Sequence, residues 1–170
     1  MAVKINPVDF GEFVDFFGGV KDLKHKIIRV LHEKSFIDDP TRIFRAVRFE
    51  QRLKFRIEPR TKYLIEHAVK ADMFRKTEDQ RLREEIILIL SEKYPEKAIL
   101  RMKALHELRF IHAKLNVDAA IAVRFKKIRQ LCSWYDKEAK ARRAISMWQA
   151  YLVELLGTLD RASASEVLRK

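Results

Sequence analysis

The sequence has little glycine, little proline and a single cysteine. Among 170 residues there are four Gly, four Pro and only Cys132, whereas 35% of the residues are charged. One cysteine excludes an internal disulfide framework and a cysteine-based zinc site. Scarce glycine and proline with abundant charge favour helices joined by short connections over a sandwich or a barrel. The composition therefore predicts a mainly α-helical chain of one ordinary domain or two small ones.

Long hydrophobic runs are also missing. No apolar stretch approaches the roughly 20 residues that a membrane-spanning helix needs. Lys4, Asp9 and Glu12 interrupt any apolar core that a signal peptide would require. Together with the single thiol, which suits a reducing compartment, these absences predict a soluble cytoplasmic protein that does not bind membranes.

Positive charge is in excess. The chain has 36 Lys plus Arg against 24 Asp plus Glu, giving a net charge of +12. Such a balance favours polyanionic partners, either nucleic acid or an anionic membrane surface. With no membrane segment in view, a nucleic acid or a nucleotide is the favoured partner.

The first residues differ from the rest of the chain. Residues 2–5 and 10–17 are rich in Val, Ile and Phe and are separated by Asn6-Pro7-Val8-Asp9, a pattern typical of two strands and a turn. An isolated hairpin is marginal in water, so we expect it to be the remnant of a larger domain. After Gly18-Gly19 apolar residues recur at helical spacing. Helices are expected over about 39–54, from 59, from 79, from 95, and over 117–135, 138–156 (ended by Gly157) and 163–170.

The most informative segment is residues 36–49, FIDDPTRIFRAVRF. Asp39 precedes proline as a natural helix N-cap, and Arg42, Arg45 and Arg48 follow at a spacing of three. One interpretation is a capped amphipathic helix with a solvated basic edge. In the other, a carboxylate acceptor beside a guanidinium donor matches the amine and ring nitrogen of adenine or cytosine. The further arginines and the helix N-terminus would then face a triphosphate.

This segment resembles the nucleobase-recognition motif of class II tRNA nucleotidyltransferases and bacterial poly(A) polymerases, which is usually Glu-Asp-x-x-Arg. The resemblance implies that Asp39 and Arg42 pair with the incoming base, and that Arg45 and Arg48 contact the nucleotide, chiefly its phosphates. Asp38 stands where the family usually has Glu, in an orienting role.

Two further stretches resemble the same family. Residues 15–30 are similar to the link between its catalytic head and its neck, and residues 80–86, QRLREEI, are similar to its Glu-Arg-Ile-x-x-Glu-Leu motif. The second implies that Arg81 with Glu84 or Glu85 braces the recognition helix. The alternative is an exposed ion-pair cluster worth under about 1 kcal/mol. The implied organisation is a β-hairpin remnant of the head (1–18), a helical neck (19–93) and a helical body (94–170).

The residues that carry phosphoryl transfer in this family are missing. Its members place a Gly-Ser loop and an Asp-x-Asp pair in the head, where two carboxylates hold magnesium ions. This sequence has no Gly-Ser and no Asp-x-Asp, and we interpret Asp136-Lys137-Glu138 as capping charge between two helices. We therefore expect no cofactor in this chain and no activity from it alone, with Mg²⁺ implied for a parent enzyme that contains the head.

Basic runs mark the two long helices of the back half. Contact with an RNA backbone is one interpretation, because phosphate binding tolerates irregular charge, and a solvated face is the other. The candidate RNA-binding residues are Lys126, Lys127, Arg129, Lys140, Arg142 and Arg143. Cys132 has no histidine motif and no cation but Arg129 near it in the sequence, and it is expected in the core. Four aromatic residues near it could stack bases, but their helical spacing favours core packing. These aromatic residues are Trp134, Tyr135, Trp148 and Tyr151.

The resemblance implies the nucleotide-selecting and tRNA-binding part of a template-independent RNA nucleotidyltransferase. The parent would add CCA, A or poly(A) to the 3′ end of tRNA or another RNA, from ATP and possibly CTP. The head of the same polypeptide would be its partner. Two alternatives stay open: a stand-alone helical RNA-binding module without catalysis, and a structural helical domain that contacts no nucleotide.

Overall fold

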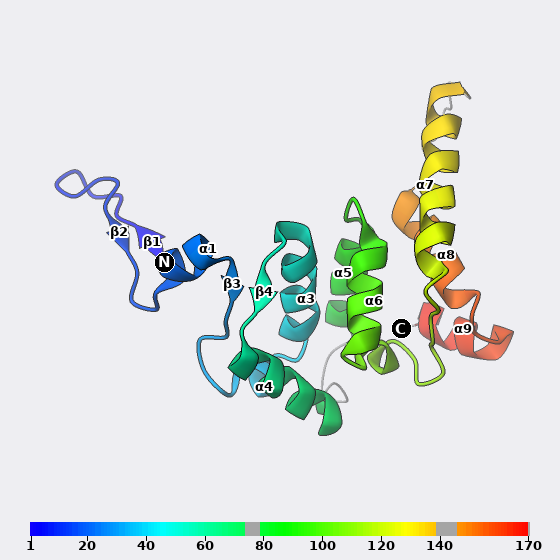
Figure 1. The fold of residues 1–170 in the computed structure, drawn as a ribbon, viewed down its shortest axis with the longest axis horizontal. Helices are drawn as coiled ribbons and strands as arrows, with labels where there is room; N and C mark the ends of the chain where they lie inside the picture. The colour runs from blue at the N-terminus through cyan, green and yellow to red at the C-terminus, as the bar shows by residue number, and fades with distance from the viewer. Residues whose placement is uncertain (74–78, 139–145, 170) are drawn as a thin grey trace.

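The computed structural model describes residues 1–73, 79–138 and 146–169. Helices dominate this part of the chain, and the strands form two small two-stranded sheets, which confirms the mainly α-helical class. The helices follow one another along an elongated molecule, with the N-terminal hairpin at one end and the C-terminal helices at the other (Figure 1). None of the described helices is both long enough and apolar enough to cross a membrane.

The N-terminal hairpin is confirmed, but its strands are short. β1 (Ala2–Val3) and β2 (Phe13–Val14) pair antiparallel, with Ala2 opposite Val14. The flanking Ile5 and Phe10 are 85% and 78% exposed. Pairing stops early because nothing in the described chain covers these side chains, and a two-stranded ribbon alone has little to stabilise it.

A second small sheet was not predicted. β3 (Ile27–Ile28) follows helix α1 (Gly19–His25), and it pairs in parallel with β4 (Arg56–Ile57). Strands of two residues are too short to show a sequence period. Their pairing places the segment after Ile28 against the helices that follow.

The predicted helix starts are largely confirmed. α3 (Arg42–Leu53) buries Ile43, Phe44 and Val47 completely, as their spacing requires. One detail is wrong: Asp39 is not the N-cap of α3, because the helix begins at Arg42 and Thr41 occupies the cap position. The elements before and after α3 are α2 (Ser35–Asp38), α4 (Pro59–Lys70), α5 (Asp79–Leu90), α6 (Pro95–Ala104) and the 3₁₀ helix η2 (Glu107–Phe110).

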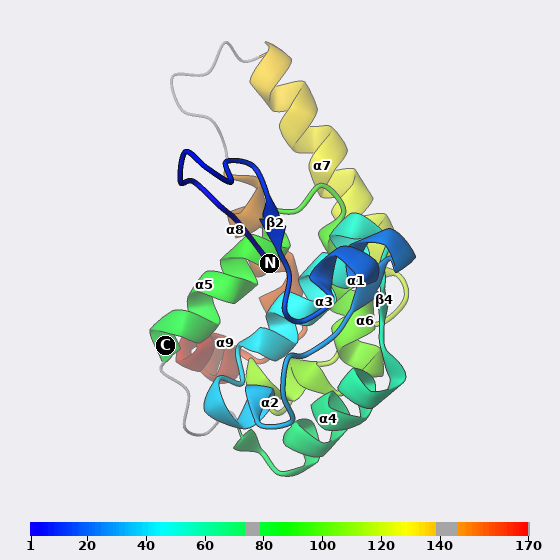
Figure 2. The same cartoon turned by 90° about the vertical axis from the view of Figure 1, so that its left-hand side faces the viewer.

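The C-terminal helices are α7 (Ile121–Glu138), α8 (Met147–Leu156) and α9 (Arg161–Arg169). Gly157 ends α8, as predicted. The triplet 136–138 lies within α7 and not between two helices, because α7 continues through Glu138. α8 begins later than the predicted residue 138. The C-terminal half of α7 projects beyond the other helices in both views (Figures 1 and 2).

One hydrophobic core joins these helices. α3 packs against α5 and α6, and α7 packs against α6 and α8, where the Phe125 and Tyr151 rings stack with centroids 4.6 Å apart. The buried cluster runs continuously from Phe36 to Leu155. It therefore crosses the neck–body boundary placed at 93/94, and that division of the chain stays a prediction.

Glu107 is a buried carboxylic acid inside this core. Glu107 is 0% exposed, and neither of its carboxylate oxygens has a hydrogen-bond partner among the described residues. Burial raises the pKa of Glu107 well above its usual range; the Arg101 charge opposes this rise and the Glu50 charge adds to it. A neutral acid is the form that such a site tolerates.

We expect the protein to lose stability as the pH rises from about 4.3, the usual Glu pKa, toward the raised pKa of Glu107. Over this range the folded state binds more protons than the unfolded state, so the unfolding free energy falls by up to about 1.4 kcal/mol per pH unit. Glu107→Gln cannot titrate and should flatten this slope. Urea denaturation at several pH values would show it, and the same slope in both proteins would contradict the prediction.

Candidate functional site

Asp39 lies in the turn between α2 and α3, with its side chain only 9% exposed. Its Oδ1 accepts hydrogen bonds from the Thr41 backbone N–H and hydroxyl, at 3.2 and 2.5 Å. Its Oδ2 accepts from Arg81 Nη2 at 2.7 Å. Burial works to raise the pKa of Asp39, but the Thr41 hydrogen bond and the Arg81 and Arg42 charges prevail and lower it. The site therefore holds an ionised acceptor in a fixed orientation.

Arg42 lies beside this carboxylate, as the motif predicts. Its Nε is 3.6 Å from Asp39 Oδ2, and its Nη1 donates to the Ser35 carbonyl at 3.3 Å. The side chain remains 43% exposed, so the guanidinium can meet a ligand. Asp38 points elsewhere: it is 52% exposed and lies 3.8 Å from His32 Nε2.

Arg45 and Arg48 converge on one carboxylate from α5. Arg45 Nε and Nη2 donate to Glu85 Oε1 at 2.9 and 2.8 Å, and Arg48 Nη2 donates to Glu85 Oε2 at 3.2 Å. The Arg45 side chain is 45% exposed, whereas that of Arg48 is 9% exposed and also lies 3.9 Å from Glu92. Arg45 thus faces solvent, and Arg48 is part of the interior.

Two residues of α5, one turn apart, bind Asp39 and two members of the arginine row of α3 (Arg42, Arg45 and Arg48). Arg81 binds Asp39, and Glu85 binds both Arg45 and Arg48. Residues at i and i+4 share one face of a helix, and this face of α5 lies on α3. Glu84 is exposed and accepts from Gln80 at 2.8 Å on its own helix. The structure thus brings together Arg81 and Glu85, but not Glu84, with the arginine row.

A hollow of about 360 Å³ opens beside the exposed arginines. Arg42 and Arg45 line it together with Phe49, Arg29 and His32. Sequence reasoning did not assign Arg29 or His32 to the site, because their approach depends on the parallel pairing of β3 with β4. Arg29 is itself held by Asp22 through two hydrogen bonds of 3.1 Å. The hollow therefore presents cationic donors beside an aromatic wall.

The described residues contain no group of three His, Cys, Asp or Glu side chains that could hold a metal ion. Asp39 and Glu85 are instead bonded to arginines. Both carboxylates are therefore already paired, and the resemblance implies magnesium-binding carboxylates in the head and not in this chain. The residues of the hollow and of the turn before α3 fit a ligand that combines a polar planar edge with negative charge.

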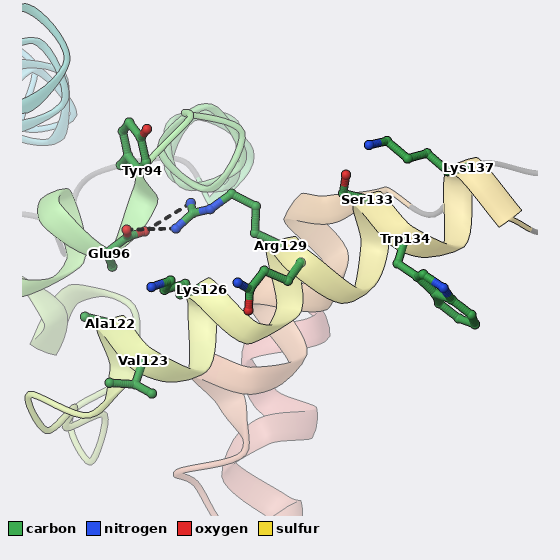
Figure 3. Close-up of a pocket in the computed structure, with 10 residues that line it drawn as sticks. Tyr94, Glu96, Ala122, Val123, Lys126, Arg129, Ser133, Trp134 and Lys137 are labelled. Atoms are coloured by element: carbon green, nitrogen blue, oxygen red, sulfur yellow. Dashed lines mark hydrogen bonds and ion pairs between the residues drawn. The ribbon is translucent and has the colours of Figure 1, made fainter.

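The predicted RNA-binding residues of α7 have different surroundings. Lys126 and Lys127 are exposed, whereas Arg129 donates to Glu96 Oε1 at 2.9 Å (Figure 3). Arg129 also donates to the Lys93 carbonyl at 2.6 Å. Lys140, Arg142 and Arg143 lie outside the residues that the structure describes.

The expectation of core packing is confirmed for Cys132 and Tyr151, which are 4% and 1% exposed. Trp148 packs at the edge of the core, and Tyr135 is half-buried. The expectation is wrong for Trp134, which is 59% exposed. It lies on the half of α7 that projects beyond the other helices, so no core is available to it.

Comparison with known proteins identifies relatives along the whole chain. No family model matches. The A-adding tRNA nucleotidyltransferase of Geobacter sulfurreducens is 41% identical over 100% of this chain and 20% of its own length. That of Aquifex aeolicus is 34% identical over 94% of this chain and 19% of its own length. The chain thus spans about a fifth of the length of these curated relatives.

Solved structures agree with these relatives. A CCA-adding enzyme in complex with ATP superposes with a TM-score of 0.84 at 39% identity, covering 98% of this chain and 39% of that one. The Thermotoga maritima CCA-adding enzyme in complex with tRNA gives the same TM-score and identity and is covered to 40%. By sequence and by fold, the chain belongs to the family of A-adding and CCA-adding tRNA nucleotidyltransferases.

Proposed function

We propose that this chain is the nucleotide-selecting and tRNA-binding part of an enzyme that adds CCA, A or poly(A) to RNA 3′ ends without a nucleic-acid template. The observation that carries the proposal is the pairing of Asp39 with Arg42 at the edge of a cationic hollow. A fixed acceptor lies 3.6 Å from a half-exposed donor. Adenine and cytosine present the complementary donor and acceptor on one edge, whereas uracil and guanine present the reverse.

Arg81 prepares Asp39 for this role. A carboxylate oxygen has two lone pairs, so Asp39 Oδ2 can keep the Arg81 hydrogen bond and still accept from an exocyclic amine. The Arg81 charge also helps to keep Asp39 ionised, which is the state that accepts. Arg81 is thus a positioning residue, and Asp39 and Arg42 are the residues that contact the base.

Arg45 is the residue we propose for the nucleotide phosphates. It lines the hollow and is 45% exposed, so its guanidinium can bind an anion while Nε and Nη2 donate to Glu85. Arg48 was predicted for the same role. Its guanidinium is 9% exposed between Glu85 and Glu92, which supports a bracing role for Arg48 in place of phosphate contact.

The catalytic head is the partner we propose for the N-terminal surface. Exposed apolar side chains gather on the hairpin and on the chain that follows it, and a large exposed apolar surface is typical of an interface. They are Val3, Ile5, Val8, Phe10, Phe13, Phe16, Phe17, Leu23 and Leu31. The head of the same polypeptide would cover this surface and supply the carboxylates that bind Mg²⁺.

The RNA partner is a tRNA or another RNA 3′ end, with ATP and possibly CTP as the nucleotides added. Exposed Lys126 and Lys127 on α7 support contact with its phosphates. Arg129 contributes less, because Glu96 neutralises it.

Nucleotide incorporation tests this function. A protein extended by a catalytic head should add nucleotides to a tRNA that lacks its 3′ end, in the presence of Mg²⁺, ATP and CTP. The 170-residue chain alone should add none above background, because phosphoryl transfer needs the metal clamp that the head supplies. If the chain alone incorporated nucleotides and Asp39→Ala abolished this activity, the proposal that catalysis requires the head would be wrong.

A further inference from the structure

A groove of about 830 Å³ runs along the exposed side of α7 (Figure 3). Tyr94 and Glu96, at the start of α6, form its far wall. Four of its α7 residues, Lys126, Gln130, Trp134 and Lys137, are spaced by four, four and three positions. This spacing places them on one face of the helix. The groove is therefore a continuous feature of α7 and not a gap between loops.

Positive charge surrounds this groove. The cations of Lys93, Lys97 and Arg129 lie over the Tyr94 ring, at 5.5, 5.3 and 5.0 Å from its centroid. The acid on this wall, Glu96, is 13% exposed and is paired with Arg129. No ion pair joins Lys126 or Lys137 to any residue that the structure describes. An anion entering the groove would thus meet cations that are largely uncompensated.

Trp134 is the unusual member of the set. Its side chain projects outward from α7 in Figure 3 and is 59% exposed, although most of its surface is apolar. Lys137 lies one turn beyond it and Gln130 one turn before it. An exposed aromatic face flanked by cations and amide donors offers stacking to a base and ion pairing to the phosphates on either side of it.

We propose that this groove binds an unpaired nucleotide of the RNA, with the base stacked on Trp134 and the flanking phosphates at Lys126 and Lys137. The inference rests on the proposed RNA-binding function and goes beyond it, because phosphate contacts alone would not distinguish paired from unpaired RNA. A base inside a duplex keeps both faces stacked on its neighbours and cannot use the indole. The groove therefore selects single-stranded or looped RNA.

The test compares two labelled RNAs, a short unpaired oligonucleotide and a blunt duplex, bound to the full 170-residue chain and followed by fluorescence anisotropy. Trp134→Ala should weaken binding of the unpaired RNA by roughly fivefold to hundredfold, as expected for one lost stack, and should leave the duplex unchanged. Trp134→Phe should retain most of the affinity. Leu131→Ala is the matched control, since Leu131 is 63% exposed on the same helix but does not line the groove.

Salt dependence separates the two parts of the site. Lys126→Ala with Lys137→Ala should reduce the slope of log K against log salt, whereas Trp134→Ala should not. If the chain binds both RNAs and Trp134→Ala weakens neither, or weakens both equally, the stacking site is wrong while RNA binding stands. If the unsubstituted chain binds neither RNA at any salt concentration, the proposed RNA-binding function fails together with the groove.

Discussion

Arg42→Ala in a head-containing protein should slow ATP incorporation by roughly tenfold to hundredfold and narrow the gap between ATP and UTP. Without Arg42, the ring acceptor of adenine is left unpaired in a partly buried site. An unmet buried polar group costs about 1–3 kcal/mol, which corresponds to that range in rate. UTP presents the reverse order of hydrogen-bond donor and acceptor and makes no such bond, so its incorporation should slow less. Single-turnover incorporation of each nucleotide measures the difference.

Arg45→Ala is the control for this experiment. Arg45 lines the same hollow and is about as exposed as Arg42, at 45% against 43%. A residue that contacts phosphates carries no information about the base, so Arg45→Ala should slow ATP, CTP and UTP by about the same factor. If Arg42→Ala also slowed ATP and UTP equally, Arg42 would not read the base, and the capped amphipathic helix would be the better interpretation of residues 36–49.

The helices were predictable because their determinants are local. Ile43, Phe44 and Val47 have the spacing of one buried helical face, and all three are fully buried. Pro59 and Pro95 stand in the first turn of α4 and α6, where proline is favoured. The β3–β4 sheet could not be predicted in this way, because its register depends on contacts between residues about thirty positions apart.

The candidate site was predictable only in its residue types. The motif places Asp39 beside Arg42 because the two residues lie three positions apart across the turn before α3, where the Arg42 N–H donates to the Asp39 carbonyl at 3.2 Å. No local rule says that Arg81, 42 residues later, binds the same carboxylate. The three arginines look equivalent in sequence, yet one of them is buried. Arg48 lies on the side of α3 that faces α5. Which of the three arginines is buried depends on how these two helices pack, and the sequence of α3 alone does not show it.

Contact with α5 therefore determines the shape of the site. The hydrogen bonds from Arg45 and Arg48 to Glu85 join α3 to α5, and the bond from Arg81 to Asp39 joins the turn before α3 to α5. Glu85 is the centre of this arrangement, since one buried carboxylate binds two guanidinium groups. Paired buried charges add little net stability, but removal of one partner leaves the others uncompensated.

Glu85→Ala should lower the unfolding free energy by about 3–5 kcal/mol, the cost of removing one partner of a buried charge. Most of this cost comes from Arg48, whose side chain is 9% exposed and whose Nε already lacks a hydrogen-bond partner among the described residues. In the variant Arg48 keeps only its longer ion pair with Glu92, at 3.9 Å. Arg45 is 45% exposed and can be rehydrated by water.

Glu84→Ala provides the matched control, because Glu84 is the adjacent residue of the same helix with the same charge. Its side chain is exposed and bonded to Gln80, so its loss should change stability by no more than about 0.5 kcal/mol. Urea denaturation of the two variants measures both values. Arg48→Met in the Glu85→Ala background should restore part of the lost stability, because it removes the uncompensated charge. If Glu85→Ala and Glu84→Ala were equally mild, the Glu85 contacts would be surface ion pairs, and α5 would not hold the recognition helix in place.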